Sequence, residues 1–227
     1  MRTIFAQGFA PMTMTTIVKR SLPIAGILLA AALTIACDST RQANDNDNDK
    51  PQPKPATPET GRVAFQNLYL AAHGWAPDVQ AFDLESEVNG DSKGQDGKSA
   101  IWRASFASPQ KRSEKLYVWS GSDSSDAPER GISPASEGSY NPGNTSTQVF
   151  NIAFLKVDSD QALKVAQEHG GEKLLKQAPD TPVIHELDWN RDSNKLLWHV
   201  IYGPSAGQAK LRVAVDATTG NFVRVEQ

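Results

Sequence analysis

The sequence contains a single cysteine, Cys37, so no disulfide can form within one copy of the chain. Its 23 basic and 26 acidic residues nearly balance and form no basic stripe, which argues against a nucleic acid as partner. No apolar run after Cys37 approaches the roughly 20 residues that a membrane-spanning helix needs. The phosphate-binding loop and the dinucleotide-binding glycines are also missing. We therefore expect a protein that is not an enzyme, needs no cofactor and is stabilised by packing.

One apolar run stands near the start of the chain, over residues 22–36, directly after Lys19 and Arg20. Its 15 residues are too few for a permanent anchor but typical of the core of a signal peptide. Because Ala36 precedes Cys37, the segment resembles the lipobox of bacterial lipoproteins, in which diacylglycerol alkylates the thiol and the chain is cut before it. A non-lipidated export signal and an uncleaved anchor are the two alternatives.

The predicted signal peptide occupies residues 1–36. Residues 1–13 fit such a signal poorly, whereas translation from Met14 would begin with a normal short basic region, so we expect Met14 to be the true start. Lipidation of Cys37 would attach an exported protein to a membrane of the bacterial envelope, on the periplasmic side. Asp38 resembles the signal that retains lipoproteins in the inner membrane.

Residues 37–61 are expected to form a disordered tether after the lipidated cysteine. Between Ala43 and Ala56 this stretch has no apolar residue, so it cannot bury enough surface to offset the entropy of ordering. Its prolines favour an extended chain of about 3.1 Å per residue. The alternating Asn and Asp residues lack the glycine and the distal glutamate of a calcium loop, so we favour a solvated linker.

The first folded unit is expected over residues 62–119. Four apolar residues follow the i, i+3, i+4, i+7 spacing of one helical face: Phe65, Leu68, Tyr69 and Ala72. Gly74 is expected to end this helix. Strand-like runs follow at 82–88, 100–106 and 115–119.

The second unit, residues 148–227, repeats this order. Asp158 and Gln161 form a capping-box pattern at the start of a helix that Gly170 is expected to end. Strand-like runs follow at 183–189, 196–202, 210–215 and 222–226. Each half has a His-Gly pair near the end of its predicted helix and a tryptophan further on. The spacing from the glycine to the tryptophan is 28 residues in both halves, from Gly74 to Trp102 and from Gly170 to Trp198. We therefore predict an α+β fold of two tandem units, each with a helix and an antiparallel sheet.

The two units are joined by residues 120–147, which are rich in Ser, Gly and Pro. These 28 residues are too many for an ordinary connection, so we expect either disorder or a binding loop. The apolar run 149–157 that follows is expected to be a buried strand.

The second unit resembles the PepSY domain. The resemblance rests on the helix 160–170, the aromatic run 197–200 and above all residues 213–223, with a turn from Asp216 to Gly220 between two closing strands. In such a turn Asp216 can bond its own backbone and Gly220 can take positive φ. The first unit shares the resemblance weakly. PepSY domains occur in protease propeptides and as exported modules, which implies a non-catalytic module that binds a peptide or a peptidase.

Trp102 and Trp198 occupy equivalent positions in the two halves, and Tyr202 lies on the same strand as Trp198. These three aromatic side chains could line a peptide groove or fill the two cores, and the core is the favoured alternative for the tryptophans. They are the candidate binding residues.

The four histidines give no clear metal site. His73 and His169 lie at predicted helix C-termini, where the helix dipole favours a cation. His185 and His199 lie on neighbouring strands and could approach each other, but no third ligand has a suitable spacing. Glu186 and Asp188 are interpreted as solvated charges rather than a catalytic pair.

Ser120, Ser122 and the serine-rich loop after them lack the Gly-x-Ser-x-Gly elbow of hydrolases. Our leading hypothesis is therefore a non-catalytic lipoprotein that binds a peptide or protein, including a peptidase, at the cell envelope. A structural or assembly lipoprotein of the envelope is the second hypothesis, and a hydrolase without a recognisable motif is the third.

Overall fold

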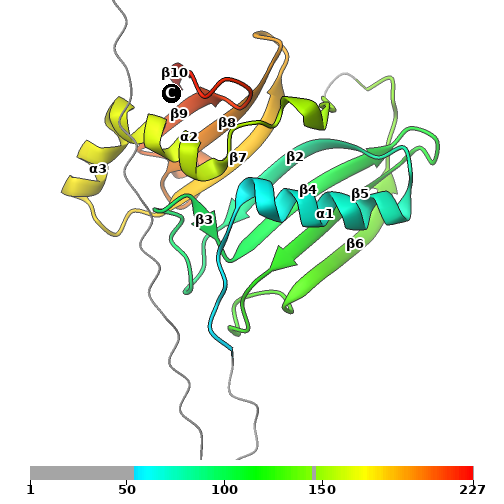
Figure 1. Cartoon of the computed structure of the whole chain (residues 1–227), viewed down its shortest axis with the longest axis horizontal. Coiled ribbons are helices and arrows are strands. Elements are labelled where there is room, and N and C mark those ends of the chain that lie inside the picture. The colour runs from blue at the N-terminus through cyan, green and yellow to red at the C-terminus, as the bar shows by residue number, and fades with distance from the viewer. Residues whose placement is uncertain (1–53, 145–146, 227) are drawn as a thin grey trace, which may run out of the picture. The chain divides into compact units, whose positions relative to one another are not determined.

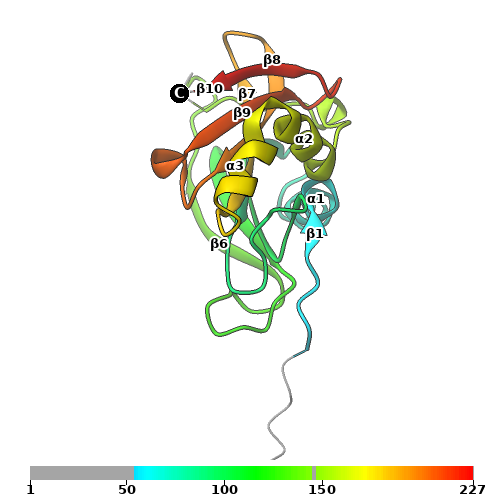
Figure 2. The ribbon, with the colours of Figure 1, turned by 90° about the vertical axis from the view of Figure 1, so that its left-hand side faces the viewer.

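The computed structural model of the chain describes residues 54–144 and 147–226 (Figure 1). The predicted signal peptide, Cys37 and most of the predicted tether lie outside these residues. The described residues form an α+β fold in which helices pack on one face of an eight-stranded antiparallel sheet (Figures 1 and 2). The predicted α+β class is thereby confirmed, whereas the two halves share one large sheet instead of having a sheet each.

The helices of this fold are α1 (Gly61–Trp75), α2 (Ser159–Ala166) and α3 (Glu172–Gln177). The strands are β1 (Glu59–Thr60), β2 (Gln80–Glu87), β3 (Lys98–Ser99), β4 (Ile101–Ser108), β5 (Ser113–Ser120), β6 (Gly131–Ser139), β7 (Val183–Asn190), β8 (Lys195–Tyr202), β9 (Leu211–Asp216) and β10 (Phe222–Glu226).

The large sheet has the strand order β10-β9-β8-β7-β2-β4-β5-β6. The first half of the chain supplies β2, β4, β5 and β6, and the second half supplies β7 to β10. The two sets meet where β2 pairs with β7, with Leu84 opposite Leu187. The two halves therefore share one continuous sheet and belong to one compact unit.

Helix α1 forms because its apolar residues recur on one face. Ala64, Phe65, Leu68 and Ala72 are buried against β2, β4 and β5. The prediction that Gly74 ends the helix is wrong, because the helix continues to Trp75. Ala76 is the first extended residue. It precedes Pro77, whose ring disfavours a helical conformation at the residue before it.

Helix α2 begins at the predicted capping box. The Asp158 side chain accepts from the N-terminal amides, and the Gln161 side chain bonds the Asp158 backbone, as predicted. Gly170 interrupts the helix in a π turn (Gln167–Gly171). Its φ is +116°, a backbone angle that only glycine adopts easily. The break at Gly170 is confirmed, but the chain resumes as α3.

The predicted loop 120–147 contains a strand. Nine of its residues form β6, which pairs with β5 from Ser113 opposite Ser139 to Ser120 opposite Gly131. The sequence of β6 reads as a loop because the strand is at the sheet edge and mostly exposed, where Pro134 is tolerated. The expectation of disorder is therefore wrong for residues 131–139.

The predicted strand over 149–157 is also wrong. Only Phe150 forms a bridge, with Ala81, and a 3₁₀ turn (Ile152–Phe154) follows. Phe150 and Leu155 are buried, whereas the side chains between them remain exposed. The apolar run thus anchors a connection at its two ends and presents its middle to solvent.

The ordered fold begins earlier than the predicted boundary at residue 62. Residues 54–60 carry little apolar surface, yet their backbone groups find partners in Gly121, Asp123, Arg130 and β3. The expectation that the tether is disordered as far as residue 61 is therefore wrong for this stretch, because polar partners order it where burial alone could not.

Candidate functional sites

A surface groove runs along α1. It is formed by two hollows of about 580 and 260 Å³ that share Tyr69 and Ile152. The α1 groove, as we name it, is lined by Arg62, Phe65, Gln66, Tyr69, Leu70, Val79, Gln80, Val149, Phe150, Asn151, Ile152 and Leu155. It therefore lies between the outer side of α1 and the connection 149–155.

Aromatic rings form the floor of the α1 groove. The ring of Phe65 lies 6.1 Å from that of Tyr69 and 6.0 Å from that of Phe150, measured between centroids. Phe65 also packs against Phe106 of β4 at 5.9 Å. Because Phe65 and Phe150 are buried, the floor is part of the main core and is held rigidly.

The rim of the α1 groove carries two exposed apolar side chains and little charge. Leu70 is 71% exposed and Ile152 on the opposite side is 41% exposed. None of the lining residues has a carboxylate, and Arg62 is their one charged side chain. The Arg62 guanidinium donates to the Lys156 carbonyl at 2.8 Å, which fixes it at one end. An exposed apolar rim over a concave surface is typical of a binding site.

The sheet has charged residues on β2 and β7 at its centre. Asp83 faces Asp188, and Glu85 faces Glu186, directly across the ladder. Facing carboxylates repel each other, so these pairs destabilise the sheet. Burial raises the pKa of Asp83 and of Glu85 above their usual values, and the neighbouring carboxylates add to both shifts.

His199 on β8 lies beside these carboxylates. Its Nδ1 is 2.6 Å from Glu226 Oε2, and its Nε2 is 3.4 Å from Asp188 Oδ1. Burial by itself would lower the pKa of His199, but the hydrogen bonds and charges of Asp188 and Glu226 raise it to about 9. Burial likewise opposes ionisation of Glu226, but His199, Arg212 and Arg224 lower its pKa to about 2. The imidazolium and Glu226 are therefore both charged at neutral pH.

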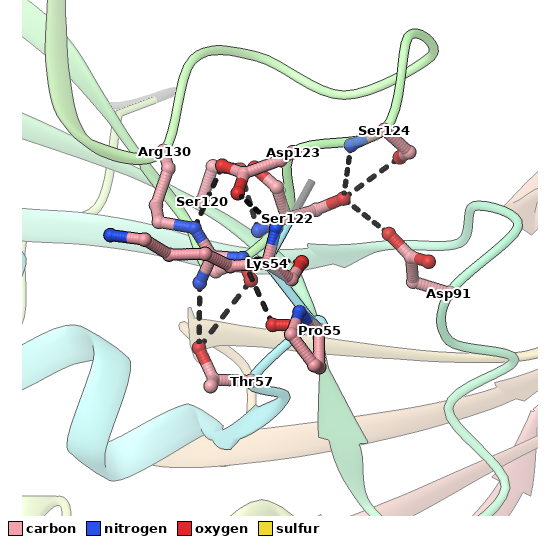
Figure 3. Close-up of polar contacts among 10 residues, drawn as sticks. Lys54, Pro55, Thr57, Asp91, Ser120, Ser122, Asp123, Ser124 and Arg130 are labelled. Carbon is pink, nitrogen blue, oxygen red and sulfur yellow. Dashed lines mark hydrogen bonds and ion pairs between the residues drawn. The ribbon is translucent and has the colours of Figure 1, made fainter. Parts of the chain in front are cut away.

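A serine-rich corner lies where β5 leads into the connection to β6 (Figure 3). The buried Ser122 hydroxyl contacts the Asp91 carboxylate and the Ser124 hydroxyl. Ser120 Oγ accepts from the Ser122 amide at 3.3 Å. These bonds tie the connection to the loop after β2. The histidines make their contacts elsewhere in the described residues, so this corner brings no histidine to a serine.

Sequence reasoning overlooked residues 90–94, which match Gly-x-Ser-x-Gly. A nucleophile elbow needs a strand, a sharp turn and then a helix. Here the segment connects β2 to the short β3, and the Ser92 hydroxyl donates to the Lys98 carbonyl at 3.0 Å. The motif is therefore a structural turn in this fold.

The three candidate binding residues, Trp102, Trp198 and Tyr202, are all completely buried. The two indole rings meet edge to face with centroids 6.4 Å apart. The Tyr202 hydroxyl has no hydrogen-bond partner among the described residues, and burial raises its pKa. All three are core residues here, so they do not line a groove. The core alternative for the tryptophans agrees with this placement.

The histidines are kept apart. His185 is buried beneath Trp102, with neither ring nitrogen hydrogen-bonded in the described residues, and burial lowers its pKa to about 4. It pairs across the ladder with Val200, while His199 pairs with Glu186, so the two rings point to opposite faces of the sheet. His73 lies in the last turn of α1. His169, in the π turn, stacks on Phe222 at 3.7 Å between centroids.

Within residues 54–144 and 147–226, no group of three or more His, Cys, Asp or Glu side chains is placed to hold a metal ion. No helix in this part of the chain is long and apolar enough to cross a membrane. Cys37, the predicted lipidation site, lies outside it.

No protein-family model and no curated protein matches the sequence. Among solved structures, the chain is similar to a "putative lipoprotein" from Clostridium difficile 630, with 12% identity. The alignment covers 72% of this chain and 91% of that one, with a TM-score of 0.47. A likeness of this size assigns neither a family nor a function.

Proposed function

We propose that this protein is an exported, lipid-anchored and non-catalytic lipoprotein of the bacterial envelope that binds an extended peptide or protein segment in the α1 groove. The export and the anchor are inferred from the basic, apolar and cysteine pattern of residues 19–37. The observation that carries the binding function is the groove itself, a depression with an aromatic floor and with Leu70 and Ile152 exposed on its two sides.

The chemistry of the groove fits an extended segment with apolar side chains. Phe65, Tyr69 and Phe150 offer a rigid aromatic floor, which loses little entropy when a ligand binds. The amides of Gln66, Gln80 and Asn151 line the same groove and can bond the main chain of a ligand. With Arg62 as the one lining charge, an acidic group at that end of the ligand would be favoured.

The resemblance to PepSY domains suggests that a peptidase is one class of partner. The hairpin of β9 and β10 supports this resemblance, because Asp216 accepts from the amides of Thr218 and Thr219 and Gly220 has φ +78°.

We also propose that the two halves arose as tandem units now fused through one sheet. Each half supplies a helix and four consecutive strands of the large sheet. In each half an indole nitrogen donates to the carbonyl two residues before its helix, from Trp102 to Glu59 at 3.0 Å and from Trp198 to Val157 at 2.9 Å. These matching contacts support a duplication.

Photo-crosslinking tests the binding function. A photoreactive phenylalanine analogue at position 70 or 152 of the full chain should capture a partner in intact cells, whereas the same analogue at exposed position 191 should not. Leu70→Glu should abolish capture from position 152. Equal capture from all three positions, or no effect of Leu70→Glu, would contradict the groove. Labelling with radioactive palmitate, lost in Cys37→Ser, tests the anchor separately.

A further inference from the structure

Residues 54–60, which we call the strap, lie against the connection between β5 and β6 before the chain enters α1 (Figure 3). The strap is the last part of the predicted proline-rich tether. Its last two residues form β1 and pair with β3, and the Glu59 carbonyl accepts from the Trp102 indole. The inner end of the strap is therefore built into the core of the fold.

The outer end of the strap is held through its main chain. Arg130 Nη2 donates to the carbonyls of Lys54 and Pro55, at 3.3 and 3.0 Å. Arg130 Nη1 donates to Thr57 Oγ1 at 3.2 Å. The Lys54 amide donates to the Asp123 carboxylate at 3.0 Å, and Asp123 in turn holds Arg130 Nε at 2.8 Å. The ion pair of Arg130 and Asp123 thus contacts three of the four residues 54–57 at the outer end of the strap.

Gly121 completes this site. Its carbonyl accepts from the Thr57 amide at 3.0 Å, and its own amide bonds Ala100. A Cβ at position 121 would lie 2.5 Å from the Thr57 carbonyl oxygen and 2.8 Å from the Trp119 ring, so a larger residue would push the strap away. The close approach of two backbones therefore depends on glycine at this position.

The chemistry of the site suits an extended, proline-containing chain. Its contacts are made with two backbone carbonyls, two backbone amides and one hydroxyl of the strap. An extended chain presents its carbonyls and amides at regular intervals. Pro55 and Pro58 restrict the strap to extended conformations, so less entropy is lost when it docks. A guanidinium is well suited to bridging several carbonyl oxygens because its donors form a fixed fork.

We propose that Gly121, Asp123 and Arg130 form a binding site for the chain's own proline-rich segment, and that this site holds residues 54–57 as a releasable end of the tether. The side chains of Arg130 and Asp123 are 26% and 29% exposed, so water can replace their bonds and the outer strap can detach without unfolding the core. Release would stop at Glu59, where β1 and Trp102 hold the chain.

Docking determines where the tether leaves the fold and how far it reaches. With the strap bound, Lys54 is held at the corner between β5 and β6. Release of residues 54–57 would add about 12 Å of extended chain between the fold and the predicted anchor, at about 3.1 Å per residue. This consequence rests on the proposed lipid anchor, whereas the docking itself does not.

Spin labelling of the full chain tests the site. In a Cys37→Ser background, a nitroxide on Lys54→Cys reports the mobility of the outer strap, because the Lys54 contacts involve only its backbone. We expect a restricted spectrum in the parent and a mobile one after Arg130→Ala, with exchange of the Thr57 amide at least tenfold faster. Arg130→Lys should give intermediate mobility, since an ammonium cannot bridge the same set of oxygens.

The matched control is Arg191→Ala, which removes an exposed arginine far along the chain and should change neither readout. Amide exchange in β9 should be the same in all variants, which separates release of the strap from unfolding. A mobile label in the parent, or a restricted one after Arg130→Ala, would overturn the proposal. Because these chains carry no lipid, the result is independent of whether Cys37 is acylated.

Discussion

The hydroxyl of Thr60 donates to the carboxylate of Asp158 at 2.8 Å and joins the first turns of α1 and α2. The same carboxylate accepts from the Arg62 amide at 2.9 Å and from the Ser159 amide at 2.7 Å. One side chain therefore satisfies unpaired amides of both helices, and its negative charge lies near the positive ends of both helix dipoles. Residues almost 100 positions apart in the sequence thus fix the two helices relative to each other.

Replacing this side chain should destabilise both helix starts at once. Asp158→Ala removes the cap of α2 and leaves the Thr60 hydroxyl and the Arg62 amide without their partner, so we expect a loss of about 2–3 kcal/mol of unfolding free energy. Asp158→Asn should lose less unfolding free energy, because asparagine also caps helices. Urea denaturation measures both. Exposed Asp192→Ala is the charge-matched control, and an equal effect there would contradict the shared cap.

The two buried tryptophans should contribute chiefly to stability. Trp198→Ala removes a completely buried indole and its bond to the Val157 carbonyl, so we expect a loss of about 3–5 kcal/mol, with a similar loss for Trp102→Ala. The partly exposed Trp75 is the control, and Trp75→Ala should lose clearly less. Thermal unfolding measures all three. A melting temperature unchanged by Trp198→Ala would show that the indole is not a core residue.

The start of α2, the apolar face of α1 and the buried strands could be predicted because side chains encode them. The capping box at Asp158 and the apolar face of α1 are both visible in the sequence. Strand β6 and the strap were missed because main-chain bonds to β5 and to Arg130 hold them, and such partners leave no local pattern. These elements depend on residues distant in the sequence, which a local pattern does not identify.

The α1 groove was missed for a different reason. The helical spacing places Tyr69 on the core face of the helix, but in the structure it lines the groove at the edge of that face. The available signal was Leu70, an apolar residue on the outer side of an amphipathic helix, together with Ile152 in the apolar run 149–157. Because single exposed apolar residues are common, only the structure shows that these two lie on one groove.

Acid should weaken the fold through His185. Its pKa is about 4 in the folded chain, against 6.5 when unfolded, because the neutral ring is buried; Asp96 and Asp158 are the charges that oppose the shift. The unfolded chain therefore binds more protons below pH 6.5, and this contribution to stability falls as the pH drops towards 4, by up to about 3 kcal/mol. Urea denaturation between pH 7.5 and 4 measures it, by comparison with His185→Phe.

Carboxylates titrate in the same pH range, so the informative quantity is the difference in unfolding free energy between the parent and His185→Phe. As the pH falls, the unfolding free energy of the parent should decrease more than that of His185→Phe. A difference that stays constant from pH 7.5 to 4 would mean that His185 is hydrated or already charged in the folded chain.

Alkali should weaken the fold through His199, with the opposite sign. Its pKa of about 9 exceeds the unfolded value of 6.5, so the folded chain holds the proton more tightly through Asp188 and Glu226. The resulting stability is fully present below pH 6.5 and is lost as the pH rises through 9, by up to about 3 kcal/mol. His199→Gln should remove this dependence, whereas His73→Gln, in the last turn of α1, should preserve it. Denaturation at pH 6 and pH 9.5 distinguishes them, and an equal loss for parent and His199→Gln would contradict the charged pair with Glu226.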